Sequence, residues 1–192
     1  IGGDLIGFIL SSGAAEQDDK LVLGLDLRTN SEIFLGNKNR MLTCSAAAGP
    51  ALEGARISHG MIARAGAIES FRFEENDIFY NVIGNIKPKG HCGSGLVDLS
   101  ALLLHHGMVD PEGLICPPDQ QKKRNSMTAS VIQTQENEIH DFLLASPRDS
   151  LDGKPIVLTQ KDIRELQLAK AAIASGIKIL LKTTGAGIED FD

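Results

Sequence analysis

The stretch Lys20-Leu-Val-Leu-Gly-Leu-Asp-Leu-Arg-Thr-Asn-Ser-Glu32 decides the fold, because an apolar run of strand length is followed at once by a polar turn. Residues 20–27 are almost continuously apolar, which is typical of a strand buried on both faces in a sheet interior. Further strands are expected at 31–35 and 40–44, separated by Gly36-Asn37-Lys38-Asn39, which has the composition of a hairpin turn. The pattern predicts three short antiparallel strands in a row.

The rest of the chain alternates apolar runs with helix-forming segments, as in an α/β protein. The expected elements are a helix at 4–12, a hairpin made of 68–73 and 78–86, a helix at 96–106, one or two strands within 128–145 and a short strand at 156–158. Residues Thr159-Gln160-Lys161-Asp162 match a capping box, and the helix that they start should run to about residue 183, before Gly185. Residues 111–126 are polar and proline-bearing, which predicts a surface loop or insertion.

Composition narrows the class of protein. The 192 residues are 42% hydrophobic with a net charge of -6, and they form one ordinary domain or two small lobes. The only basic cluster is Lys122-Lys123-Arg124, so we expect no nucleic-acid binding, and no apolar run approaches a membrane span. Cys44, Cys92 and Cys116 lack metal-site spacing, which indicates free thiols in a reducing, cytoplasmic setting.

The first candidate for chemistry is the turn from Asp26 to Glu32. A carboxylate at a strand end, followed by hydroxyl and amide groups, can hold a hydrated magnesium ion and cup a phosphate with backbone N–H groups. The alternative is a simple β-turn in which Asp26 and Asn30 satisfy local backbone donors.

Two further glycine-bearing corners lead into helices. In Gly49-Pro50-Ala51-Leu52-Glu53-Gly54, backbone donors at a helix start could face a phosphate or ribose, with Glu53 near its hydroxyls; a capped helix packed on a sheet is equally compatible. Gly90-His91-Cys92-Gly93-Ser94-Gly95 is neither a P-loop nor a dinucleotide motif. We interpret His91 as a turn histidine beside a packed thiol, and His105-His106 as a helix C-terminal cation site. Together the three corners could surround one anion.

Four segments carry a resemblance to a known family: residues 26–37, 44–55, 92–98 and 159–170. In this order they resemble the ATPase region of the reductive activators of corrinoid proteins, within the acetate and sugar kinase, heat-shock chaperone and actin superfamily. The resemblance implies a ribonuclease-H-like, actin-type α/β lobe with a mixed sheet and flanking helices. It covers nearly the whole chain. Because the chain starts in mid-pattern at Ile1 without Met and lacks the family's adenosine loop, residues 1–192 are interpreted as a partial domain.

The resemblance also implies a function for individual residues. Asp26 would bind magnesium through water, Thr29 and Asn30 phosphate, and Glu53 ribose or a magnesium-bound water. The remaining expected cofactor contacts are Arg28, Gly49, Pro50, Gly54, Gly93, Ser94 and Gly95. The family has glycine where this chain has Arg28, whose side chain either crowds the phosphate or supplies a cation to it.

The cofactors implied are ATP and Mg, with an iron–sulfur cluster only in the missing part of the parent protein. The implied partner is the corrinoid protein of a methyltransferase or O-demethylase system, and a homodimer is possible. Two rival functions stay open. One is a small-molecule kinase of the same superfamily, although no carboxylate base stands out. The other is a non-catalytic module that docks the corrinoid protein.

Overall fold

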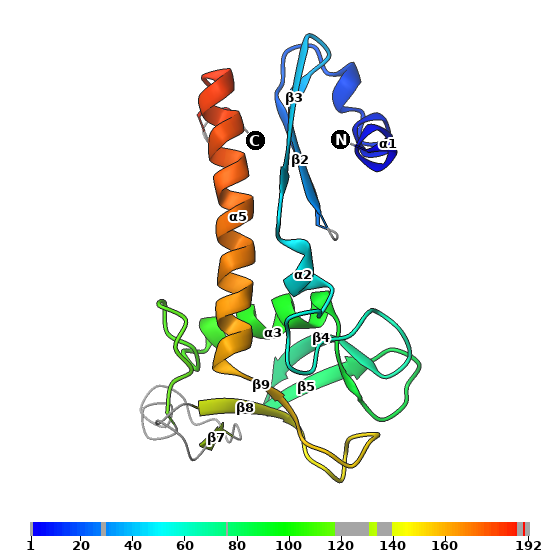
Figure 1. Ribbon diagram of the computed structural model, residues 1–192, viewed down its shortest axis with the longest axis vertical. Coiled ribbons are helices and arrows are strands. Elements are labelled where there is room, and N and C mark those ends of the chain that lie inside the picture. Colours follow the sequence, from blue (N-terminus) through cyan, green and yellow to red (C-terminus); the bar gives the residue numbers. More distant parts are fainter. Residues whose placement is uncertain are drawn as a thin grey trace. The chain divides into compact units, whose positions relative to one another are not determined.

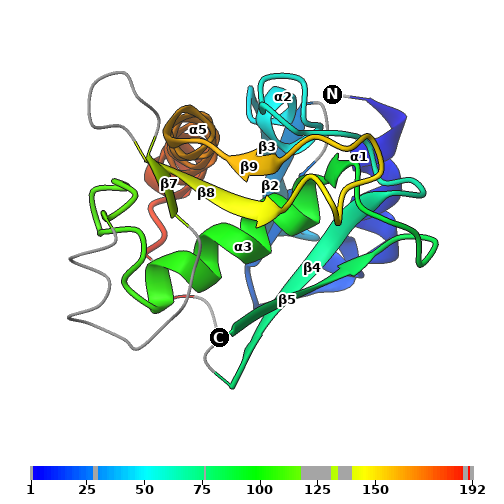
Figure 2. The ribbon, with the colours of Figure 1, turned by 90° about the horizontal axis from the view of Figure 1, so that it is seen from below.

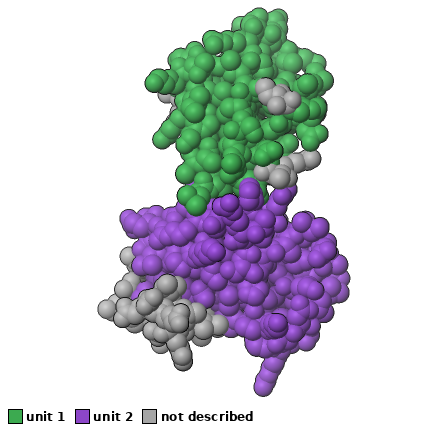
Figure 3. Space-filling view, in the orientation of Figure 1, with its two compact units in different colours: residues 1–49, 168–192 green, residues 50–167 purple. Residues whose placement is uncertain are grey.

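The computed structural model describes residues 2–27, 30–75, 77–117, 131–133, 140–187 and 190, with the backbone alone for 131–133. The chain divides into two compact units (Figure 3). Unit 1 comprises Ile1–Gly49 and Leu168–Asp192, and unit 2 comprises Pro50–Gln167. Among the described residues, no helix is both long and apolar enough to cross a membrane.

Unit 1 is built on three antiparallel strands, β1 (Val22–Asp26), β2 (Ser31–Asn37) and β3 (Arg40–Ala46), in the order β1-β2-β3. The predicted hairpin and the three-strand series are confirmed. The placement of residues 20–27 in the sheet interior is wrong, because in the described sheet β1 pairs only with β2 and Leu25 is 39% exposed. The central strand is β2, whose residues 33–35 are fully buried.

Helices cover both faces of this sheet (Figure 1). Ile33 and Leu35 face α5 (Gln160–Thr184) and pack with Leu180. Phe34 points the other way and packs with Leu5 of α1 (Gly3–Ser11). This alternation follows from the two-residue period of a strand. A short 3-10 helix, η1 (Ala14–Glu16), links α1 to β1.

Unit 2 holds two small sheets and a helix that covers one of them. Strands β4 (Ala67–Glu74) and β5 (Asp77–Val82) form the predicted second hairpin, and β6 (Gly90–His91) joins β4 in parallel. The other sheet has the order β7 (Val131–Gln133), β8 (His140–Ala145) and β9 (Ile156–Leu158). Helix α3 (Gly93–His105) lies across β4 (Figure 2), where the Phe71 N–H donates to Asp98 Oδ2 at 2.5 Å.

The capping box at the start of α5 is confirmed by its hydrogen bonds. The Thr159 N–H donates to Asp162 Oδ2 at 2.9 Å, and the Asp162 N–H donates to Thr159 Oγ1 at 3.1 Å. At the other end Gly185 adopts φ 75°, and its N–H donates to Leu181 O at 2.9 Å. Most of the predicted 111–126 loop lies outside the described residues, so that assignment stays a prediction.

Candidate functional site

The first corner lies at the end of β1 in unit 1. Asp26 is half-buried, is paired across the sheet with Glu32, and lines a hollow of about 370 Å³. The other residues that line this hollow are Leu25 and three side chains of α1: Asp4, Phe8 and Ser11. Asn30 is exposed beside it in sequence, whereas Arg28 and Thr29 lie outside the described residues. Asp26 therefore borders open space on the side of α1.

The second and third corners meet within unit 2. Helix α2 (Gly49–Leu52) is only four residues long, so the expected helix dipole at Gly49 and Pro50 is small. It ends in a turn that carries the exposed Glu53 and then Gly54, which has φ 77°. A Cβ atom on Gly93 would clash with the carbonyl oxygen of Leu52, which shows that the two corners are in direct contact. The position of the Asp26 corner relative to them stays a prediction.

Packing accounts for the glycines of these corners. Besides the contact of Gly93 with Leu52, a Cβ atom on Gly95 would clash with Ile68 O of β4. Ser94 Oγ donates to Glu69 O at 2.9 Å, which anchors the start of α3 to the same strand. The glycines are thus required by the chain's own backbone, and their predicted role in letting a ligand approach is not tested by this geometry.

The chain buries one carboxylate whose wider role the sequence did not reveal. Asp162 is 0% exposed. Beyond its capping bonds, its Oδ1 accepts from the Ser58 N–H at 2.8 Å and from Ser58 Oγ at 3.1 Å. The capping box indicated Asp162, but no local signal could pair it with a residue 104 positions away. The bonds tie the loop after the second corner to the start of α5.

His91 is a buried strand residue of β6 rather than the expected turn histidine. It is 1% exposed, and neither ring nitrogen has a hydrogen-bond partner among the described residues. Burial lowers the pKa of His91, and the nearby Asp162 carboxylate opposes that shift. The neutral imidazole is therefore favoured. The adjoining Cys92 is 3% exposed, which confirms a packed thiol.

The remaining candidates are the three thiols and the His105–His106 pair. Cys44 is half-buried, Cys92 and Cys116 are buried, and no disulfide joins them in the described part of the chain. Within the described ranges, no group of three or more His, Cys, Asp or Glu side chains could hold a metal ion. His106 stacks against Phe73, with ring centroids 3.9 Å apart, and burial followed by the neighbouring His105 lowers its pKa. A cation at His106 is thus disfavoured, whereas His105 lies in the last turn of α3, as the predicted C-terminal cation site requires.

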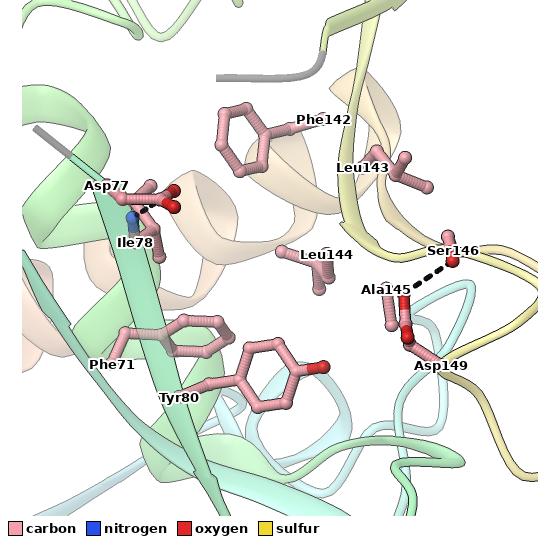
Figure 4. Close-up of a pocket in the computed structure, with 10 residues that line it drawn as sticks. All are labelled: Phe71, Asp77, Ile78, Tyr80, Phe142, Leu143, Leu144, Ala145, Ser146 and Asp149. Carbon is pink, nitrogen blue, oxygen red and sulfur yellow. Dashed lines mark hydrogen bonds between the residues drawn. The ribbon is translucent and has the colours of Figure 1, made fainter. Parts of the chain in front are cut away.

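A second hollow lies between the β4–β5 hairpin and the end of β8 (Figure 4). Its volume is about 290 Å³, and its lining includes the aromatic rings of Phe71, Tyr80 and Phe142. Asp149 stands at its edge, where it accepts a hydrogen bond from Ser146 Oγ at 2.5 Å. Burial, and then the charge of Asp149, raises the pKa of Tyr80. Because the lining comes from distant strands, no sequence motif indicated this hollow.

The fold is that of an actin-like ATPase domain, with mixed sheets and flanking helices. Residues 20–192 match the family described as the C-terminal domain of RACo, the ASKHA domain, and the chain belongs to this family.

The similar proteins align with the whole length of this chain. It is 36% identical over 192 residues to the "Corrinoid activation enzyme RamQ" of Eubacterium limosum. It is 26% identical over 205 residues to the "[Co(II) methylated amine-specific corrinoid protein] reductase" of Methanosarcina barkeri. A solved structure, "Reductive activator for corrinoid,iron-sulfur protein", covers all of the chain with 38% identity and a TM-score of 0.83. The chain spans 32% and 34% of the two relatives and 29% of the solved chain.

Proposed function

We propose that this chain is the ATPase part of a longer protein that uses ATP to drive the reductive activation of cobalt(II) corrinoid proteins in methyl-transfer systems. The observation that carries the proposal is the likeness, over the whole chain, to three proteins that are named for corrinoid activation or reduction. The iron–sulfur cluster that would deliver the electron belongs to another part of the polypeptide. The protein would act in the cytoplasm.

The chemistry of the first corner fits a magnesium nucleotide. Asp26 offers carboxylate oxygens beside a hollow of about 370 Å³, where Ser11 adds a hydroxyl group. Because Mg²⁺ gives up its waters reluctantly, it would reach Asp26 through a bound water. Asn30 and the neighbouring Thr29 would contact phosphate, with Arg28 as a possible cation.

The second and third corners carry the other acid that is assigned to the nucleotide. Glu53 is exposed just after α2, and a carboxylate there can accept hydrogen bonds from ribose hydroxyls or from magnesium-bound water. When bound, ATP would supply the free energy for an electron transfer that is uphill for cellular donors. The contribution of this chain is to bind and orient the nucleotide.

The proposal is tested by Asp26→Ala in the full-length protein, with Asp19→Ala as a matched control on an exposed loop of the same unit. We expect Asp26→Ala to abolish ATP-dependent reduction of the corrinoid protein, followed by the visible spectrum of the cobalt centre, with an unchanged circular dichroism spectrum. Asp19→Ala should behave like the unaltered protein. Full activity of the Asp26 variant would refute the magnesium role.

A non-catalytic docking module is the second candidate, and it is favoured by Arg28 at a position where the family has glycine. Calorimetric titration of the full-length protein with ATP separates the two. Binding of ATP with corrinoid-stimulated hydrolysis supports the ATPase. Corrinoid-protein binding without any response to ATP supports docking alone.

A further inference from the structure

Three loops of unit 2 are joined into one surface, here called the basic loop cluster: residues 61–66, 83–89 and 146–154. The Gly66 N–H donates to Ile83 O at 2.9 Å, and the Lys89 N–H donates to Gly66 O at 2.8 Å. The Leu151 N–H donates to Pro88 O at 2.8 Å. The loops that follow β5 and β8 therefore lie side by side, as seen at the lower right of Figure 1.

The charge of this cluster is opposite to that of the chain. Its five cations are Arg64, Lys87, Lys89, Arg148 and Lys154, and all are exposed. Only two carboxylates accompany them, those of Asp149 and Asp152, so the cluster has a net charge of +3 in a chain whose net charge is -6. A local field of this sign attracts an acidic surface.

Each loop also exposes a large aliphatic side chain. The exposed fractions are 60% for Ile62, 44% for Ile86 and 50% for Leu151. An apolar centre with a polar rim is the usual arrangement of a protein–protein interface.

A hydrogen bond and an ion pair cross-link the loops. Gly66, Gly84 and Gly153 have φ values of 91°, 84° and 68°, a region that favours glycine, and Asn85 has φ 51°. Side chains add cross-links, since Lys87 Nζ donates to Arg148 O at 2.7 Å and Lys89 Nζ lies 3.5 Å from Asp152 Oδ2. A surface with a defined conformation loses little entropy on binding.

We propose that the basic loop cluster is a docking surface for an acidic protein surface with an apolar centre. In the full-length protein the corrinoid protein supplies the acidic surface, an assignment that rests on the function proposed above. The positive charges would speed the encounter, and the three aliphatic side chains would slow dissociation. The cluster includes none of the residues assigned to the nucleotide, so docking and ATP binding can be altered separately.

The test is biolayer interferometry of the full-length protein against its immobilised corrinoid protein. We expect the double variant Arg64→Glu/Lys154→Glu to lower the association rate constant about tenfold at low salt and to weaken its dependence on ionic strength. Ile86→Asp should mainly raise the dissociation rate constant. The matched controls are Lys170→Glu/Lys178→Glu and Ile6→Asp, which change exposed residues of unit 1 and should leave both constants unchanged.

The same variants are assayed for ATP binding and for adherence to duplex DNA and to vesicles of phosphatidylserine and phosphatidylcholine. Loss of docking with ATP binding intact supports the proposal, even if Asp26→Ala shows the nucleotide role to be wrong. Corrinoid-protein binding that is absent from the unaltered protein, or equal in all variants, overturns it. A loss of binding that is confined to DNA or to vesicles also overturns the proposal.

Discussion

Replacing Asp162 with alanine should release the start of α5 and the Ser58 loop together. The substitution removes both side-chain oxygens from a fully buried position. One oxygen accepts from the Thr159 N–H at 2.9 Å, and the other accepts from the N–H and hydroxyl of Ser58 at 2.8 and 3.1 Å. The Thr159 hydroxyl keeps its own bond to the backbone of residue 162, so only part of the capping box is lost.

The expected cost follows from these bonds. Loss of the capping interaction at Thr159 costs about 1 kcal/mol. The two bonds from Ser58 share one oxygen and are counted together as about 1.5 kcal/mol, the low end for a hydrogen bond to a charged group, because Ser58 is exposed and water can replace part of them. The sum is about 2.5 kcal/mol, equivalent to a roughly sixtyfold increase in local opening. Asp162→Asn keeps one acceptor and should cost about half as much.

Hydrogen exchange followed by mass spectrometry measures this opening directly at the amides of Ser58 and Thr159. In Asp162→Ala both amides should lose protection together by about sixtyfold, with a smaller loss in Asp162→Asn. Ser58→Ala is the matched control, because it removes the hydroxyl's bonds to Asp162 and to Thr159 Oγ1 but leaves the Ser58 N–H bonded to the carboxylate. If Asp162→Ala changed protection at Thr159 but not at residue 58, the shared role of Asp162 would be refuted.

Two further predictions concern unit 2 and α1. Gly93→Ala should lower the free energy of unfolding by about 2 kcal/mol in urea denaturation, because its Cβ would meet Leu52 O. Gly7→Ala, a helix position with nothing within 4 Å, should raise it by about 0.5–1 kcal/mol, and equal effects would contradict the packing argument. Because burial lowers the pKa of His91 from its ordinary value of 6.5, the unfolded chain binds a proton first, so stability should fall as the pH drops below about 6.5. His91→Gln should flatten this slope in urea denaturation at several pH values, and an unchanged slope would assign it to other groups.

Elements with a complete local signal could be predicted from the sequence. The β2–β3 hairpin, the capping box of α5 and its end at Gly185 each depend on residues close together in the chain. The position of each strand within the sheet, central or at an edge, could not be predicted from local signals. The apolar run before Asp26 suggested an interior strand, but burial depends on which neighbours cover each face, and β2 occupies the central position.

In the candidate site, too, long-range contacts could not be predicted from local sequence. The second and third corners are in contact through Leu52 and Gly93, whereas the convergence of all three corners around one anion stays a prediction. The bond between Ser58 and Asp162 was missed because it joins residues 104 positions apart, each of which has an ordinary local explanation. The hollow of Figure 4 was missed for a similar reason, since its lining depends on how β5 and β8 face each other.

The residues that can decide the nucleotide proposal are therefore the acids rather than the glycines. Enlarging Gly93 or Gly95 would disturb backbone packing whether or not a ligand binds, so a loss of activity in such variants would not identify a nucleotide site. Asp26 and Glu53 are different, because neither lies in the buried core: Asp26 is half-buried and Glu53 is exposed. A variant at either acid that keeps its fold and loses only the response to ATP separates ligand binding from packing, which no substitution at the glycines can do.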